Sequence, residues 1–367
     1  MTKDFYTFDA GCVVENELYF SSNFLNGLYS RNLVTGDVRF IGEFPDETHE
    51  RCHLHKQCLR WNNKLIFLPS LSRHIHIWDI KEERFTQIKL SDRTTAEMYA
   101  GGCIYCDKLF LFPILLEECL VIYDLQTKSL QEVSYFTEWC KNNIHPQNDK
   151  YTFTRICQID NEVYMPVNKS DEIVIFNLAA QSLTYKTVEV KDLFFIVAGD
   201  NGMKWAVTNS EKYIYLLDDF LNVKEKIYCD ISKQKPIQSI NNLIVLDREV
   251  YVLPRKSGRI LRLNRAKRKF ECLKNDDLLR YYNESGIKFL GFGIYQEKIL
   301  IYPRNSDGIL CIENGEVTCL KNNFDLEKYK KKYQEHYQRY ISSIFKKEEI
   351  MKESELVTLQ DFISDIV

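Results

Sequence analysis

Residues 154–188, TRICQIDNEVYMPVNKSDEIVIFNLAAQSLTYKTV, are the stretch that decides the fold. Four short apolar runs, at 154–159, 163–166, 173–176 and 183–188, are separated in it by polar segments. Asp160, Asn161 and Glu162 follow the first run, and Asn177 follows the third, which are residue types typical of tight turns. The stretch therefore predicts four short antiparallel strands joined by turns.

The same pattern returns along most of the chain. Its most constant feature is an apolar anchor that opens the second run, and the seven anchors are Leu18, Leu65, Leu109, Val163, Met203, Val250 and Ile299. The anchors lie 40 to 54 residues apart, which is the period of a propeller blade. Seven copies predict an all-β fold, a seven-bladed β-propeller over residues 1–322.

Turn and strand-end residues recur at fixed distances from the anchors. Proline falls four residues after an anchor at Pro69, Pro113, Pro254 and Pro303 and three after it at Pro166, and we expect it to end the second strand. Serine stands seven residues after the anchor in five copies, Ser72, Ser170, Ser210, Ser257 and Ser306, which favours a repeated turn role over a catalytic one. Asp or Asn near the end of the third strand is expected to cap the turn into the fourth.

The fifth copy is the least regular, because it lacks the proline and Asp218-Asp219 disturbs its turn. A six-bladed ring is therefore the alternative.

Two third-strand endings, Ile77-Trp78-Asp79-Ile80 and Ile122-Tyr123-Asp124-Leu125, resemble those of WD-type and kelch-type blades. On these residues the chain resembles the β-propeller superfamily over about residues 5–322. It has neither the glycine doublet that marks kelch blades nor the Gly-His pair of WD repeats. The resemblance therefore implies the architecture, and it assigns no functional residues.

Composition limits the classes of partner and the compartment. A net charge of −3 argues against nucleic acid and membrane surfaces as partners. No apolar run is long enough for a transmembrane helix, and the N-terminus has no signal-peptide pattern. The twelve cysteines are then best explained as reduced thiols, and we expect a cytoplasmic protein.

One face of the predicted ring should carry the site. The second-to-third-strand loops and the blade-to-blade connections emerge together on it, and we call it the upper face. Loops on a rigid scaffold are the usual place for binding. The candidate residues for a ligand or partner there are Arg60, Trp139, His145, Arg155, Arg255 and Arg304, of which Arg60 and Arg155 are expected to face the central channel.

Histidines gather on the connection from the first blade to the second, in residues 49–55, HERCHLH. His53 and His55 would point to one side of an extended strand, a spacing that a metal site can use. We expect no cofactor, and a divalent metal held by His49, His53 and His55 is the alternative. His74 and His76 repeat the alternation, and we expect them to be solvated strand residues.

The pattern changes period after residue 322. Leu326, Tyr329, Tyr333, Tyr337 and Tyr340 recur at helical spacing, so residues 323–367 predict a C-terminal α-helical extension. It should pack on the propeller or on a partner.

The absence of a unique catalytic cluster favours a non-catalytic binding or scaffold propeller of the cytoplasm, which recognises a protein or peptide through the upper face. One alternative is an enzyme, a metal-assisted lyase or hydrolase with its site at the channel mouth. Another is a carbohydrate-binding propeller that uses Tyr and Trp as stacking platforms.

Overall fold

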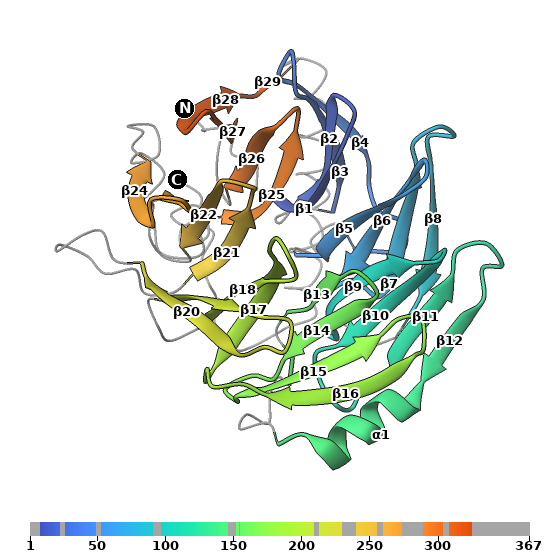
Figure 1. The fold of residues 1–367 in the computed structure, drawn as a ribbon. Coiled ribbons are helices and arrows are strands. Elements are labelled where there is room, and N and C mark those ends of the chain that lie inside the picture. Colours follow the sequence, from blue (N-terminus) through green and yellow to red (C-terminus); the bar gives the residue numbers. More distant parts are fainter. Residues whose placement is uncertain are drawn as a thin grey trace, which may run out of the picture.

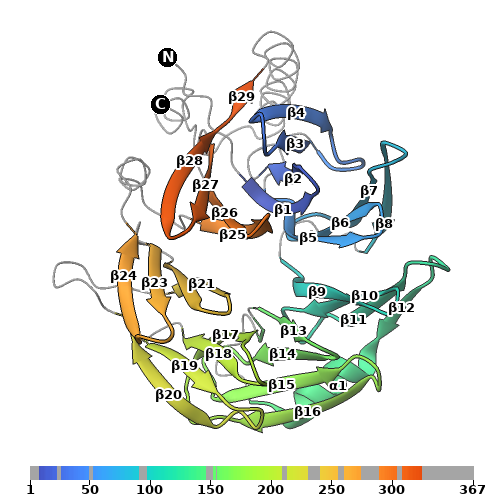
Figure 2. The same ribbon diagram turned by 45° about the horizontal axis from the view of Figure 1, so that its top comes forward.

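The structure is a computed structural model that describes residues 8–22, 26–48, 53–90, 97–145, 152–153, 155–208, 213–229, 240–254, 260–273, 289–303 and 308–324. In these residues seven antiparallel sheets stand in a ring, and each sheet is one blade (Figures 1 and 2). Within each blade the strands follow chain order from the centre of the ring outward (Figure 2). The fold is a seven-bladed β-propeller, so the six-bladed alternative is wrong.

The blades divide the chain into seven consecutive groups of four strands. Blades 1 to 4 are β1 (Phe8–Val14), β2 (Glu17–Ser22), β3 (Leu28–Asn32) and β4 (Asp37–Gly42); β5 (His55–Trp61), β6 (Lys64–Pro69), β7 (His74–Asp79) and β8 (Arg84–Lys89); β9 (Tyr99–Tyr105), β10 (Lys108–Pro113), β11 (Leu120–Asp124) and β12 (Leu130–Val133); β13 (Cys157–Ile159), β14 (Glu162–Pro166), β15 (Glu172–Asn177) and β16 (Ser182–Thr187). Blades 5 to 7 are β17 (Leu193–Ala198), β18 (Lys204–Thr208), β19 (Tyr213–Leu217) and β20 (Val223–Tyr228); β21 (Ile240–Val245), β22 (Glu249–Pro254), β23 (Ile260–Asn264) and β24 (Lys269–Leu273); β25 (Phe289–Tyr295), β26 (Lys298–Pro303), β27 (Gly308–Glu313) and β28 (Glu316–Lys321).

The anchors form the packed layer between the blades. In six copies the anchor is the second residue of the second strand, and its side chain is buried. The fifth copy differs, since Met203 precedes β18 and the buried residue in the anchor position is Trp205, 3% exposed. The anchor of blade 5 therefore lies two residues later than the sequence pattern suggests, and its second strand ends at Thr208 rather than at a proline.

The predicted turn chemistry is confirmed where the structure describes it. Asp124 Oδ1 accepts the backbone N–H groups of Gln126 and Thr127 at 3.0 and 2.7 Å, and Asn32, Asp79, Asn177, Asp218 and Asn264 make equivalent bonds. Ser72 Oγ accepts the N–H of His74 at 3.0 Å. All five recurring prolines end a second strand.

The ring closes by direct contact of blade 7 with blade 1. A short strand, β29 (Asn323–Phe324), adds to the outer edge of blade 1 parallel to β4. The Arg31 side chain, 1% exposed, crosses the junction and donates to Asn322 Oδ1 at 2.7 Å and to the carbonyls of Leu320 and Lys321 at 3.2 and 3.0 Å. Blades 1 and 7 each have four strands of their own, and β29, which follows blade 7 in the chain, joins the sheet of blade 1 as a fifth strand.

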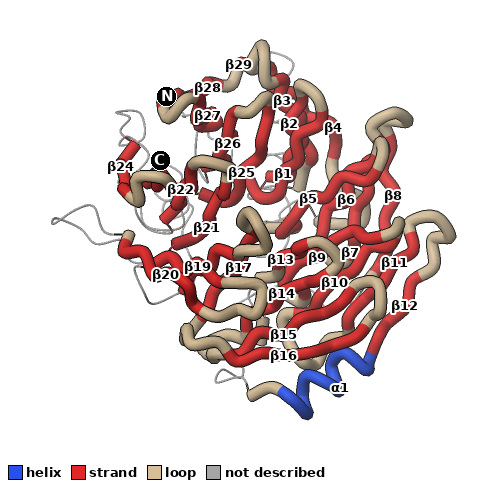
Figure 3. Tube along the Cα trace, in the orientation of Figure 1, coloured by secondary structure: helices blue, strands red, loops and turns tan. Residues whose placement is uncertain are grey.

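One helix, α1 (Ser134–Asn143), is the exception to the all-β pattern of the described residues (Figure 3). It lies at the rim of the ring between the outer strands of blades 3 and 4 (Figure 1). Of the predicted helical extension at 323–367, residues 323–324 form β29 and the others lie outside the described residues. None of the described helices is long and apolar enough to cross a membrane.

Candidate functional site

The mouth of the central channel on the upper face collects side chains from most blades. Because each blade is an up-and-down meander, all the innermost strands run in one direction, and their first residues meet at the same end of the ring. The innermost strands β1, β5, β9, β13, β17, β21 and β25 surround the centre in Figure 2. A site built at this mouth can therefore draw on several blades at once.

Five charged residues from four successive blades lie at these strand starts, and we call them the mouth cluster: Asp9, His53, Lys56, Glu97 and Arg155. His53 Nδ1 is 2.7 Å from Asp9 Oδ1, and its Nε2 is 3.4 Å from Glu97 Oε1. Glu97 Oε2 is 3.5 Å from Lys56 Nζ. The side chains of blades 1, 2 and 3 are thus tied together by ion pairs around the mouth.

Hydrogen bonds from His53 to Asp9 and Glu97 raise the pKa of His53 to about 10, so this imidazole is a cation at neutral pH. The bond to His53 lowers the pKa of Glu97 to about 2. Burial raises the pKa of Asp9, while His53 opposes that shift. The Asp9 side chain is 2% exposed and that of His53 37%, so the cluster runs from a buried floor to an open rim.

Arg155 extends the mouth cluster across the ring. Its guanidinium donates to Asn242 Oδ1 of blade 6 at 2.6 Å and lies over the Phe194 and Phe195 rings of blade 5, 4.8 and 5.3 Å from their centroids. Arg155 also contributes to lowering the pKa of Lys56, an effect for which burial is the main cause. The mouth therefore holds two groups of contacting side chains, one from blades 1 to 3 around His53 and one from blades 4 to 6 around Arg155.

The mouth cluster is suited to bind an anion. His53, Lys56 and Arg155 give three positive charges against two from Asp9 and Glu97, a balance of +1 within the cluster. Positive charge in a half-buried concave site attracts carboxylates more strongly than the same charge on an open surface. The ion-pair and hydrogen-bond partners already fix these side chains, so less side-chain entropy is lost when a ligand binds.

The structure places the residues proposed from the sequence in different parts of the ring. Arg155 lies at the mouth, as expected. Arg60 is at the far end of β5, where its Nε donates to the Asn62 carbonyl at 3.2 Å, so it belongs to the opposite face. The cause is the length of β5, which carries its last residues to the lower turn.

Trp139 and His145, which follow β12 on the connection from blade 3 to blade 4, lie away from the channel. Trp139 is on α1 and packs against Tyr185 of the outermost strand of blade 4, with ring centroids 6.2 Å apart. His145 is 87% exposed and faces Glu172, with its Nδ1 3.6 Å from the carboxylate. His49, Arg255 and Arg304 lie outside the described residues.

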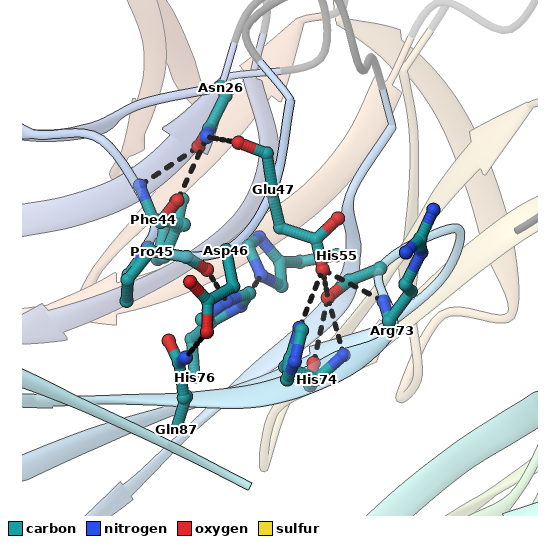
Figure 4. Close-up of polar contacts among 11 residues, drawn as sticks. Asn26, Phe44, Pro45, Asp46, Glu47, His55, Arg73, His74, His76 and Gln87 are labelled. Atoms are coloured by element: carbon teal, nitrogen blue, oxygen red, sulfur yellow. Dashed lines mark hydrogen bonds and ion pairs between the residues drawn. The ribbon is translucent and has the colours of Figure 1, made fainter. Parts of the chain in front are cut away.

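His53 and His55 do not point to one side. His53 has a positive φ of 53° and precedes β5, so the strand alternation does not include it. His55 turns into the junction between blades 1 and 2, where its Nε2 is 2.9 Å from His76 Nδ1 (Figure 4). The expectation that His74 and His76 are solvated is wrong, since both are buried under the blade connection.

Three members of the mouth cluster, Asp9, Lys56 and Glu97, were not found from the sequence. A signal for them exists, because each is a charged residue at or just before the start of an innermost strand. Many surface loops carry such residues, so the signal becomes specific only when the strand starts are known to converge.

No family model matches the sequence, and no curated protein sequence matches it significantly. Solved structures similar in fold include virginiamycin B lyase from Staphylococcus aureus, with a TM-score of 0.60 and 12% identity over 82% of this chain and 92% of that one. A second is YCF48 bound to D1 peptide, with a TM-score of 0.59 and 11% identity over 83% and 92%. A third is PorZ of Porphyromonas gingivalis, with a TM-score of 0.58 and 12% identity over 87% of this chain and 38% of that one. At these identities the likeness shows the fold alone, which is the β-propeller architecture described above.

Proposed function

We propose that this protein is a non-catalytic binding propeller of the cytoplasm, which recognises a protein or peptide through its upper face. In this proposal the mouth cluster contacts an acidic group of the partner. The observation that carries it is the mouth cluster itself, five charged side chains from four successive blades at one mouth, in which cations outnumber carboxylates.

Two further observations support recognition of a peptide. YCF48, a propeller of similar fold, is bound to a peptide in its solved structure. The mouth also presents Arg155, held by Asn242, and Arg is one of the side chains favoured in protein interfaces. In the described part of the chain the cysteines are free thiols, which supports a reducing compartment.

The chemistry of His53 supports binding over acid–base catalysis. A general base works best with a pKa near the operating pH, whereas the pKa of His53 is raised to about 10 by its two carboxylate partners. Phe194 and Phe195 are buried and covered by Arg155, so they are poor candidates for an open stacking platform for sugars. Lyase and carbohydrate-binding activities are therefore less well supported than peptide recognition.

A panel of fluorescently labelled peptides tests the proposal. The peptides share one sequence and differ at a central position, which is Glu, Gln or Lys, and anisotropy measures their affinity for the native protein. We expect the Glu peptide to bind about tenfold more tightly than the Gln peptide and to lose affinity as salt is added. Equal binding of all three peptides, or a preference for Lys, would contradict the proposal.

A further inference from the structure

A second group of polar side chains lies apart from the mouth, buried in the junction between blades 1 and 2 (Figure 4). Glu47 lies on the connection from β4 to β5, and His74 and His76 lie on β7; we call these three residues the junction cluster. One ligand atom from each lies within 4.8 Å of the other two. We infer that the junction cluster is a binding site for one divalent transition-metal cation of the Zn²⁺ type, held by Glu47, His74 and His76.

The donor set selects this class of cation. Two imidazole nitrogens and one carboxylate oxygen are common ligands of zinc, while Ca²⁺ and Mg²⁺ prefer oxygen ligands throughout. His74 and His76 are two residues apart on β7, so both side chains leave the strand on the same side, toward Glu47. The strand and the connection thus present three donors to one point.

The distances fit a site that needs little rearrangement. Glu47 Oε1 and His74 Nδ1 are 3.1 Å apart. Two ligands of a tetrahedral zinc ion lie about 3.3 Å apart, given zinc–nitrogen bonds of about 2.05 Å. The ligand atom of His76 lies within 4.8 Å of both of these atoms. To reach a separation of about 3.3 Å it must move by no more than the difference between these two distances.

The surrounding hydrogen bonds resemble those of a ligand shell. His76 Nε2 donates to the Pro45 carbonyl at 3.0 Å, which leaves a lone pair on Nδ1. Metal-binding histidines commonly donate their second ring nitrogen to a backbone carbonyl in this way. Glu47 Oε1 accepts from Ser72 Oγ at 2.7 Å and from the Arg73 N–H at 2.8 Å, and such bonds orient a ligating carboxylate.

His55 lies beside the junction cluster and bonds to one of its ligand atoms. Its ring is 0% exposed, and its Nε2 donates to His76 Nδ1 at 2.9 Å, but its Nδ1 has no hydrogen-bond partner among the described residues. A cation at His76 Nδ1 would take the lone pair that His55 now uses, so binding requires the His55 ring to move, and a ring held by a single hydrogen bond can do so.

The position assigns a structural role to the cation. Glu47 belongs to the connection that leads to the mouth, and the Asn26 side chain already holds this connection through the carbonyls of Phe44 and Glu47 at 2.9 and 3.2 Å. A cation shared by Glu47 and β7 would fasten blade 1 to blade 2. Since a cation that binds only the folded state stabilises it, the melting temperature should rise when the cation is added.

Zinc titration of the full-length protein tests the inference. The protein is purified without an affinity tag, stripped with a chelator, and titrated with ZnCl₂ against a chromophoric competitor at neutral pH. We expect one equivalent bound with micromolar or tighter affinity. The variants Glu47→Gln, His74→Gln and His76→Gln should each lose about a hundredfold or more in affinity, whereas His145→Gln should not. His145 is the matched control because it also faces a glutamate, Glu172, but at an exposed site.

Cobalt(II) spectroscopy of the native protein decides the matter even where a variant does not fold. Nitrogen and oxygen ligands give visible d–d bands without the near-ultraviolet charge-transfer band of thiolates, which separates the junction cluster from the free cysteines. No stoichiometric metal, a thiolate band, or unchanged zinc affinity in folded variants of Glu47, His74 and His76 would overturn the inference.

Discussion

Replacing Arg31 by methionine should open the ring at its closure. The guanidinium is 1% exposed and spans blades 1 and 7 through bonds to Asn322 Oδ1 and to the carbonyls of Leu320 and Lys321. Methionine keeps much of the aliphatic stem but leaves these three acceptors without their donor. A buried neutral acceptor left without its donor costs about 1–3 kcal/mol, so we expect the three together to cost about 4 kcal/mol once the guanidinium no longer has to be desolvated.

The melting temperature converts this cost into an observable. With an unfolding entropy of about 2.1 cal/mol/K per residue, roughly 320 residues give about 0.7 kcal/mol/K, so about 4 kcal/mol lowers Tm by about 6 °C. Differential scanning calorimetry measures the shift, and hydrogen exchange should show the loss of protection first in β28 and β4.

Arg39→Met is the matched control for this prediction. Arg39 lies on the neighbouring strand β4 and pairs with Glu83 at 3.5 Å, but both side chains are exposed. An exposed pair contributes at most about 1 kcal/mol, so its Tm should change by less than about 2 °C. Equal shifts in the Arg31 and Arg39 variants would refute the closure role of Arg31.

Two other predictions concern packing and pH. Gly293→Ala should destabilise the protein by about 1–3 kcal/mol in urea unfolding, because the new Cβ would clash with the buried Tyr302 hydroxyl. Tyr302→Phe should recover most of that loss, since it removes a hydroxyl without a partner among the described residues; a double variant as unstable as the single one would contradict this. The pKa of His53 is raised from 6.5 to about 10. The contribution of this group to the free energy of unfolding is therefore complete below pH 6.5 and is lost as the pH rises through about 10. The pKa of Glu97 is lowered from 4.5 to about 2, so the contribution of this carboxylate to the free energy of unfolding is complete above pH 4.5 and is lost as the pH falls through about 2. The native protein should therefore lose about 1 kcal/mol of stability between neutral and alkaline pH through His53, a figure discounted for the exposure of this pair, and His53→Gln should abolish that loss. The same loss of stability at alkaline pH in the variant would count against the ion pairs of His53.

The ring could be predicted from the sequence because each repeat is defined by interactions between residues close in the chain. Anchors, strand-ending prolines and Asp or Asn turns depend on residues close in the chain; six blades keep the anchor spacing and five end their second strand with proline. Blade 5 shows the limit of the method, since Trp205 takes the anchor position assigned to Met203. Helix α1 was missed because it begins after Val133 without a side-chain cap, so its start carries no signal.

The site depends on long-range geometry, which the repeat does not encode. His53 could be identified as unusual, but its partners Asp9 and Glu97 come from other blades. His53 and His55 seemed equivalent under strand alternation, and a single positive φ at His53 sends one to the mouth and the other to the blade junction. His76 is likewise buried because the connection between blades 1 and 2 covers β7. No local sequence pattern predicts this cover.

The most direct test of recognition at the mouth compares two variants of the same strand. Lys56→Met removes a cation at the start of β5, and Arg60→Met removes one near its end, on the opposite face. With the Glu peptide of the panel, we predict that Lys56→Met weakens binding about tenfold while Arg60→Met leaves it unchanged. Equal affinity of the native protein and the Lys56 variant, or a larger loss in the Arg60 variant, would contradict recognition at the mouth cluster.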